Sequence, residues 1–435
     1  MDSPYDDSYL IGLDYKITKI SNFINDITFK SFYSNVDHLM TNENRPSFMM
    51  TGASTNVFAT TYGGKLEFSL SPNENSMLFT GIDANLISRE GDRIRIVKVM
   101  NGNVLPQPMT KIDKVWQDAT LNDFGVFAEL KYNLANKTTV TTGARVDFIS
   151  SSIDDPAIQM TELYGDIEDK NETNFSGNIA IKRNFKDAQI QLAIGRGTRK
   201  ASMMERYINH FNIGVDPYEY MGNPNLDPEI NNQIEFSYKK QYKKINIGAS
   251  VFYSIIEDYI TAIVNEDVPR LYMPMTEPRF VKQFVNVDQA MQSGFEFNFD
   301  YKATNNLTFA TNTAYTYAKN KDFNEPLAQI QPLTVNVNTI FEKKNYWVKL
   351  NAHFIAKQDR ISTTFRETES NAYATFDLSA GIQPTKNLTI GASVLNIFDK
   401  AYFDHLNFSY KNSNTLSGRI FEPGRNFTAY VKYKF

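Results

Sequence analysis

The chain has 435 residues, and its 45 Lys and Arg against 49 Asp and Glu give a net charge of −4, which argues against a nucleic-acid-binding protein because such proteins usually carry a basic excess. The mean hydropathy is −0.41, and no stretch approaches the roughly 20 apolar residues that a membrane helix requires. The sequence contains no Cys, which excludes disulfide frameworks, thiolate zinc sites and Cys nucleophiles.

The N-terminal residues are acidic and polar, from Met1 to Asp7, whereas a secretory signal needs a basic segment followed by an apolar one. We therefore expect either a cytosolic protein or the downstream part of a longer precursor whose signal lies before Met1. The C-terminal pattern described next favours the second possibility.

Apolar residues occupy every second position in runs that recur along the chain, as in strands with one apolar and one polar face. Clear runs occur at 124–132, 245–253, 295–301, 388–394 and 427–435. The strands predicted around such runs are about 10 to 16 residues long, more than the roughly 5 or 6 of ordinary globular strands and enough to cross a bilayer at a tilt. The pattern predicts an all-β fold, a transmembrane antiparallel β-barrel.

The connections between these runs alternate between short and long. Short polar turns are predicted near residues 72–75, 135–137, 185–187, 304–306, 343–345 and 384–386. Long connections are predicted at roughly 35–50, 91–117, 151–170, 201–227, 265–279, 320–332, 360–370 and 400–420. Short turns at one end and long loops at the other are typical of outer-membrane barrels, although a soluble all-β protein such as a propeller remains an alternative.

About eight short and eight long connections predict about 17 strands, whereas single-chain bacterial barrels have an even number. We interpret the odd number as further evidence of a truncated barrel.

Four sequence segments, in this order, resemble the TonB-dependent receptors of Gram-negative outer membranes. They are 222–229 (Gly-Asn-Pro-Asn-Leu-Asp-Pro-Glu), 286–296 (ending Gly-Phe-Glu), 394–400 (Val-Leu-Asn-Ile-Phe-Asp-Lys) and 424–427 (Gly-Arg-Asn-Phe) before the terminal Phe435. The resemblance covers essentially the whole chain, and Phe435 matches the aromatic residue of a barrel-assembly signal.

The resemblance implies a barrel of roughly 22 strands, preceded by a plug domain and a TonB-binding segment. Neither has a counterpart in this sequence, so we expect one domain, 1–435, comprising about 17 strands of a 22-strand barrel with no plug and no signal peptide. The implied location is the outer membrane. The implied partners are outer-membrane lipid and lipopolysaccharide, the barrel-assembly machinery, and TonB only through the missing N-terminal part, with no nucleic acid.

Catalytic motifs are absent from the sequence: it has four His, no His-Glu-x-x-His, no Gly-x-Ser-x-Gly and no phosphate-binding Gly loop. By strand parity His353, Arg145 and Asp147 face the barrel interior, where polar lining is expected. We therefore predict that the protein is not an enzyme.

Methionine in the long connections suggests a soft-metal ligand, because thioethers and imidazoles suit cuprous copper. The candidates in these loops are Met49, Met50, Met203, Met204, His210, Met273 and Met275. Scattered Met also fills gaps in packing, and 14 Met in 435 residues is little above ordinary usage, so composition leaves both readings open.

Copper receptors of the resembled family place a His-x-Met pair on the barrel opposite Cys and Met ligands on the plug. His38 and Met40 match that pair and are the metal-site candidates implied by the resemblance. The predicted function is TonB-dependent uptake of a scarce metal or metal chelate, with copper favoured as the transported ligand and no covalently bound cofactor.

Three alternatives remain. A ferric-siderophore or haem receptor could stack its iron chelate on aromatic residues of the outer loops, such as Tyr207, Phe211, Tyr218, Tyr220, Tyr272 and Phe280. A passive porin would lack a separate gate, and a surface adhesin would transport nothing.

Overall fold

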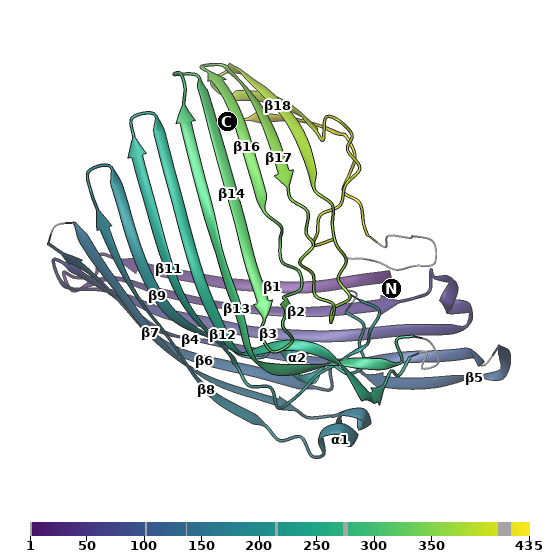
Figure 1. Cartoon of the computed structure of the whole chain (residues 1–435). Coiled ribbons are helices and arrows are strands. Elements are labelled where there is room, and N and C mark those ends of the chain that lie inside the picture. The colour runs from purple at the N-terminus through teal and green to yellow at the C-terminus, as the bar shows by residue number, and fades with distance from the viewer. Residues whose placement is uncertain (1, 101, 136, 214–215, 273–276, 408–418) are drawn as a thin grey trace.

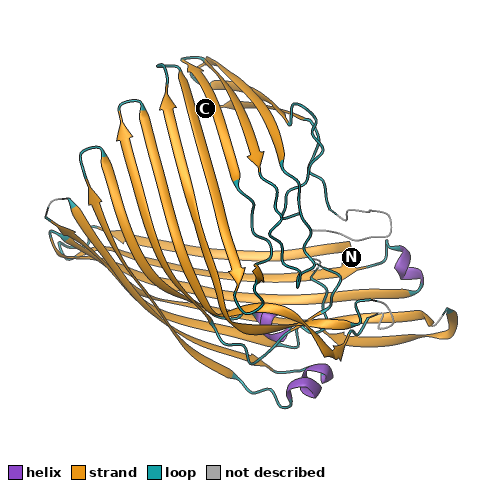
Figure 2. Ribbon diagram, in the orientation of Figure 1, coloured by secondary structure: helices purple, strands orange, loops and turns teal. Residues whose placement is uncertain are grey.

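The computed structural model describes residues 2–100, 102–135, 137–213, 216–272, 277–407 and 419–435. The 20 strands that these residues form all belong to one sheet (Figures 1 and 2). The predicted loop candidates Met273 and Met275 lie outside the described residues. Within the described residues, no helix is both long and apolar enough to cross a membrane.

Seventeen of the 20 strands follow one another in chain order, and each pairs antiparallel with the next. These strands are β1 Asp2–Thr18, β2 Ile24–Thr41, β3 Thr51–Asn73, β4 Ser76–Met100, β6 Ala119–Leu134, β7 Thr138–Ile153, β8 Lys170–Asn184, β9 Ala188–Arg199, β11 Glu229–Tyr242, β12 Ile245–Pro269, β13 Phe280–Lys302, β14 Leu307–Asn320, β16 Thr334–Lys343, β17 Tyr346–Ile355, β18 Tyr373–Thr385, β19 Leu388–Leu395 and β20 Asn426–Tyr433. The predicted fold class and strand number are confirmed.

Three further strands and three short helices lie in the long connections. They are β5 Asn103–Lys114, β10 Tyr220–Met221, β15 Glu325–Pro326, the 3-10 helix η1 Pro46–Met49, and the α-helices α1 Ile158–Tyr164 and α2 Met203–Tyr207. β5 pairs with the outer part of β4, so much of the connection predicted at 91–117 is a β-hairpin rather than an irregular loop. The first predicted long connection, 35–50, is also too long, because β2 remains paired with both β1 and β3 as far as Thr41.

The sheet is strongly curved, and in Figure 1 its strands follow the curve from the purple N-terminal end towards the yellow C-terminal end. Within the described residues, β1 pairs only with β2 and β20 only with β19. The two outermost strands therefore each present one free backbone edge, and nearly all of their residues are exposed.

The two faces of the sheet differ as the sequence pattern predicts. On β8, Ile179 and Ile181 are 46% and 48% exposed, and they pair with the exposed Ile194 and Leu192 of β9. Leaving such a continuous apolar surface in water would be costly, at about 25 cal/mol for each Å². The residues that alternate with these apolar ones, such as Asn178, belong to the opposite, polar face. One face therefore suits hydrocarbon and the other water.

Candidate functional site

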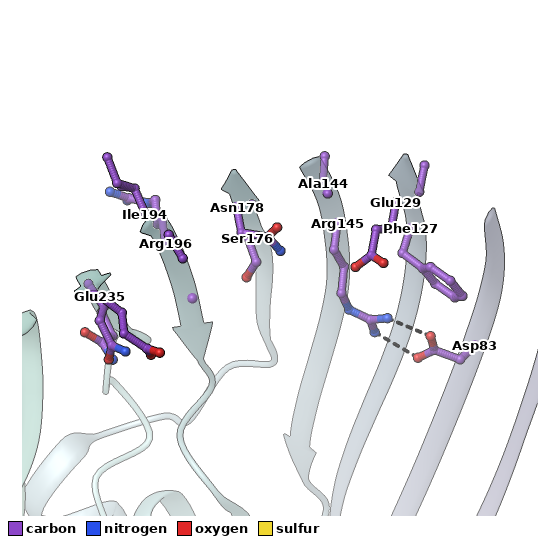
Figure 3. Close-up of a pocket in the computed structure, with 18 of the residues that line it drawn as sticks. Asp83, Phe127, Glu129, Ala144, Arg145, Ser176, Asn178, Ile194, Arg196 and Glu235 are labelled. Carbon is purple, nitrogen blue, oxygen red and sulfur yellow. Dashed lines mark hydrogen bonds and ion pairs between the residues drawn. The ribbon is translucent and has the colours of Figure 1, made fainter. Parts of the chain in front are cut away.

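The polar inner face contains a charged wall near the middle of the strands (Figure 3). Arg145 of β7 donates two hydrogen bonds to Asp83 of β4, at 2.6 and 2.8 Å, and also forms an ion pair with Asp147. Gly125 of β6 lies between them, and a Cβ at this position would overlap the guanidinium of Arg145. The absence of a side chain at Gly125 therefore lets the side chain of Arg145 lie across β6. There it contacts both Asp83 and Asp147 and links β4 to β7.

The metal-site candidates His38 and Met40 lie on β2, not in a loop. Register places Asp6 and Val57 beside His38, and Thr55 beside Met40. Thr55 in turn pairs with Arg93, which has the same parity on β4 as the inner-face Asp83. His38 and Met40 are two residues apart, so both belong to the inner face, towards the long-loop end of β2.

The imidazole of His38 is only partly engaged. Its Nδ1 lies 3.4 Å from Asp6 Oδ2, and the side chain is 28% exposed. No partner of Nε2 is found among the described residues. Orientation of one ring nitrogen by a carboxylate, with the other nitrogen open, is the usual arrangement of a metal-binding imidazole.

The other three His have structural roles. His353 Nδ1 lies 2.6 Å from Asn336 Oδ1, and its Nε2 lies 3.2 Å from Asp377 Oδ2. Both ring nitrogens of His405 have partners at 3.0 Å, Ser370 and Glu367. The buried His210 has its Nδ1 3.0 Å from Glu219 Oε2.

The loop methionines do not come together as one ligand set in the described residues. Met203 is 4% exposed and packs with Tyr207 in one apolar cluster, whereas Met204 packs against a second one. Met49 and Met50 are 76% and 56% exposed at the end of η1. Gap-filling thus accounts for Met203 and Met204, whereas Met49 and Met50 remain accessible to solvent.

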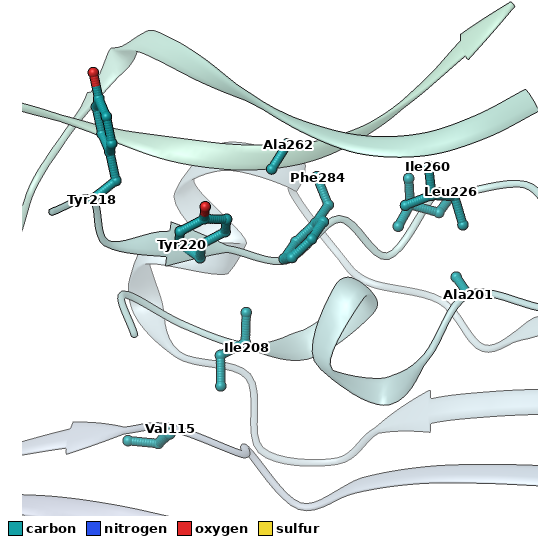
Figure 4. Packing of buried hydrophobic residues seen from close by; sticks show 9 residues of the cluster. All are labelled: Val115, Ala201, Ile208, Tyr218, Tyr220, Leu226, Ile260, Ala262 and Phe284. Carbon is teal, nitrogen blue, oxygen red and sulfur yellow. The ribbon is translucent and has the colours of Figure 1, made fainter. Parts of the chain in front are cut away.

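The long loops share an apolar core at one end of the sheet (Figure 4). Its buried residues come from the β4–β6, β9–β11 and β12–β13 regions and comprise Val115, Ala201, Ile208, Tyr218, Tyr220, Leu226, Ile260, Ala262 and Phe284. Burial raises the pKa of Tyr220, whose hydroxyl donates to Asp216 at 2.9 Å. These aromatic rings pack on one another rather than lining an open platform.

Lys282 lies beside this core and forms an ion pair with Asp216. The side chain of Lys282 is fully buried and that of Asp216 is 3% exposed. The Nζ of Lys282 also lies 4.9 Å from the ring centroid of Tyr218 and 4.3 Å from that of Phe365. Burial lowers the pKa of Lys282, and Asp216 opposes that change by stabilising the charged form.

Glu219 connects two loops through its buried carboxylate. It accepts hydrogen bonds from the backbone nitrogens of Leu271 at 2.8 Å and Tyr272 at 2.9 Å, in addition to its contact with His210. Sequence reasoning missed both Glu219 and Lys282. A weak signal existed for Lys282, which follows Phe280 and Val281 and is followed by Gln283, Phe284 and Val285, so that a cation among apolar residues would need a partner if buried.

Comparison with known proteins identifies the fold independently. The family model "TonB dependent receptor-like, beta-barrel" matches residues 2–397. The solved structure of the copper transporter OprC superimposes with a TM-score of 0.82 at 22% identity, covering 100% of this chain and 66% of that one. The FrpB iron transporter from Neisseria meningitidis gives a TM-score of 0.71 at 14% identity, covering 98% of this chain and 63% of that one. At such identities the likeness concerns the fold alone.

Curated sequences give a different set of relatives. Heme/hemopexin utilization protein C of Haemophilus influenzae is 30% identical over 230 residues, which is 47% of this chain and 32% of that protein. The vitamin B12 transporter BtuB of Vibrio vulnificus is 25% identical over 215 residues, covering 49% of this chain and 31% of that protein. The matches thus span about a third of the length of these relatives. Because the family model matches most of the chain, the protein belongs to the TonB-dependent receptor family of outer-membrane β-barrels.

Proposed function

We propose that residues 1–435 serve as the barrel domain of an outer-membrane transporter that takes up copper with energy supplied through TonB. Family membership, together with the apolar outer face and the polar inner face of the sheet, supports the first part of this proposal, transport across the outer membrane. The choice of copper depends on the residues of the inner face.

One observation carries the copper proposal: an open imidazole nitrogen of His38 and the thioether of Met40 belong to the same inner face, two residues apart on one strand. Imidazole and thioether are ligands that suit cuprous copper, whereas ferric iron prefers harder donors. Two donors do not complete a tight site, so further ligands must join them when copper binds.

The second candidate is a haem or iron-chelate receptor, and the Haemophilus relative favours it. The described side chains offer less for this ligand. Three of the four His are engaged in hydrogen bonds, Tyr218 and Tyr220 are buried in the loop core, and Tyr207 is buried in the cluster that contains Met203. An aromatic platform for a flat chelate would require the loops to rearrange.

The test is copper uptake by cells that carry the complete receptor, compared with the double variant His38→Ala/Met40→Ala. We expect at least a tenfold loss of copper uptake at limiting copper, since removing both donors leaves no soft ligand on this strand. Unchanged copper uptake would contradict the copper proposal, whereas haem-dependent growth that fails in the same variant would favour the haem receptor.

Two matched controls separate ligand loss from general damage. His353→Ala removes an inner-face His whose nitrogens are both engaged, and Met77→Ala removes an exposed thioether at the start of β4, at the other end of the sheet from Met40. Both variants are expected to retain copper uptake when expressed at the same level.

A further inference from the structure

Two neighbouring turns at the short-turn end of the sheet carry an unusual concentration of positive charge. The ends of β8 and β11, together with the turns that follow them, contribute five exposed cations, here called the turn-side basic cluster: Arg183, Lys186, Lys240, Lys243 and Lys244. The two turns are adjacent because β9 pairs with β11, where Ala188 lies opposite Lys240. The backbone nitrogen of Gln241 also donates to the carbonyl of Asp187 at 2.8 Å.

These cations have no carboxylate partners in the part of the chain that the structure describes. None of the five forms an ion pair, and Lys244 donates instead to the carbonyl oxygen of Ala303 at 3.2 Å. Asp187 is the only acidic residue in the two turns, and it is exposed. The cluster therefore presents an excess of positive charge that no ion pair with a described residue neutralises.

The cluster also lies at the border of the lipid-facing surface. Phe185 and Tyr242 are 45% and 54% exposed beside it. The guanidinium of Arg183 is 5.4 Å from the ring centroid of Phe185, and the Nζ of Lys243 is 5.9 Å from that of Tyr242. Exposed aromatic rings are typical of the membrane interface, and Lys and Arg stems can lie along such rings while their charged ends reach the headgroups.

Register shows that each of the two strands carries one cation on the outer face and one on the inner face. Arg183 lies opposite Ile190, on the apolar outer face, whereas its neighbour Lys182 lies opposite Gln191 on the inner face. Lys240 lies opposite Ile247, also on the outer face, and its neighbour Lys239 lies opposite Gly248 on the inner face. The same two strand ends thus carry one pair of cations towards lipid and another towards the lumen.

We propose that the turn-side basic cluster binds the phosphate groups of anionic phospholipids in the membrane leaflet at the short-turn end. Short turns of outer-membrane barrels face the periplasm, so this is the inner leaflet. Exposed cations beside interfacial aromatic rings provide charge attraction to the phosphates and apolar contact with the adjoining lipid chains. The proposal concerns a lipid contact of the barrel and does not depend on which ligand the protein transports.

The register supplies a matched experiment. The outer-face variant Arg183→Gln/Lys240→Gln and the inner-face variant Lys182→Gln/Lys239→Gln each remove two charges at neighbouring positions of the same strands. Each folded receptor, held in neutral detergent micelles, is titrated with phosphatidylglycerol, and the bound lipid is counted by native mass spectrometry. Phosphatidylcholine provides the neutral comparison.

We expect the outer-face variant to bind phosphatidylglycerol about tenfold more weakly than the unmodified receptor, because each cation near an anionic lipid surface contributes appreciably to binding. The inner-face variant should change this binding by less than about twofold, and neither variant should alter phosphatidylcholine binding. Equal losses in the two variants would overturn the proposal in favour of bulk charge. Loss in the inner-face variant alone would overturn it in favour of an acidic partner at the mouth of the lumen.

Discussion

At the long-loop end of the sheet, the cations Arg95, Arg206 and Lys282 each contact a carboxylate, whereas at the short-turn end Lys240, Lys244 and Lys343 are exposed and, in the described part of the chain, form no ion pair. The loops bury charge together with aromatic rings and therefore have to neutralise it internally. The turns bury almost nothing, so their charges can be met by solvent or lipid. Lys and Arg thus form internal ion pairs at the long-loop end of the sheet, whereas at the short-turn end they are available for contacts outside the protein.

The largest expected effect that tests this contrast is that of Lys282→Met. Removal of the ammonium leaves the carboxylate of Asp216 buried without a cation, which we expect to destabilise the loop core by about 3–5 kcal/mol. Hydrogen exchange of residues 199–229 should accelerate while exchange in the strands stays slow. The double variant Lys282→Met/Asp216→Asn removes both charges and should recover most of the protection. A single variant with normal exchange would refute an internal role for this ion pair.

A smaller effect is expected at the middle of the wall, where charge is only partly buried. Arg145→Met leaves Asp83 and Asp147 facing each other on the inner face, and we expect a loss of about 1.5–3 kcal/mol in the free energy of unfolding. Urea unfolding of the barrel in detergent measures it. Arg145→Lys retains one positive charge and should lose less, since a lone ammonium can still neutralise one carboxylate but lacks the two-pronged geometry of the guanidinium.

Acid should weaken the start of α2 by about 1 kcal/mol. Burial opposes ionisation of Glu205, but its hydrogen bonds from Arg199 at 2.9 and 3.1 Å and from the backbone of Ser202 outweigh that cost, so its pKa is lowered. This stabilisation is complete above the ordinary pKa of 4.5 and is lost as the pH falls through the lowered folded value. The protection of the α2 amides, taken as their exchange rate relative to the intrinsic rate at the same pH, should fall over that acidic range, and Glu205→Gln should abolish the dependence.

The smallest effect is expected at the short-turn end. Lys343→Gln removes an exposed charge without an ion pair, so the free energy of unfolding should change by less than about 0.5 kcal/mol in the same urea assay. A loss as large as that of Arg145→Met would show that the turn-end cations have an internal structural role and would remove the contrast between the two ends.

The strands were predictable from the sequence because alternation is local: runs such as 245–253 and 427–435 reveal their two faces without knowledge of any partner. The ends of the long connections were less predictable. β2 continues through His38 and Met40 because β1 and β3 provide backbone partners on both sides, and that depends on how far the neighbouring strands extend.

The loop core was not predictable in the same way, because its contacts join distant parts of the chain. Asp216 and Lys282 are 66 residues apart, and Glu219 accepts from a backbone nitrogen 53 residues away. Methionine in a loop is equally consistent with packing and with metal binding until its neighbours are known. The structure gives Met203 and Met204 packing roles, leaves Met49 and Met50 exposed, and places His38 and Met40 on one inner face.

The most direct test of the two-faced sheet uses the absence of Cys from the chain, which provides a background free of other thiols. Ile179→Cys and Asn178→Cys place a thiol at adjacent residues of β8 on the outer and inner faces, respectively. Each variant is labelled with a small fluorophore and reconstituted into bilayers containing brominated lipid, which quenches on contact. We predict strong quenching at residue 179 and little at residue 178; equal quenching at the two positions, or the reverse order, would contradict a sheet with one face in lipid.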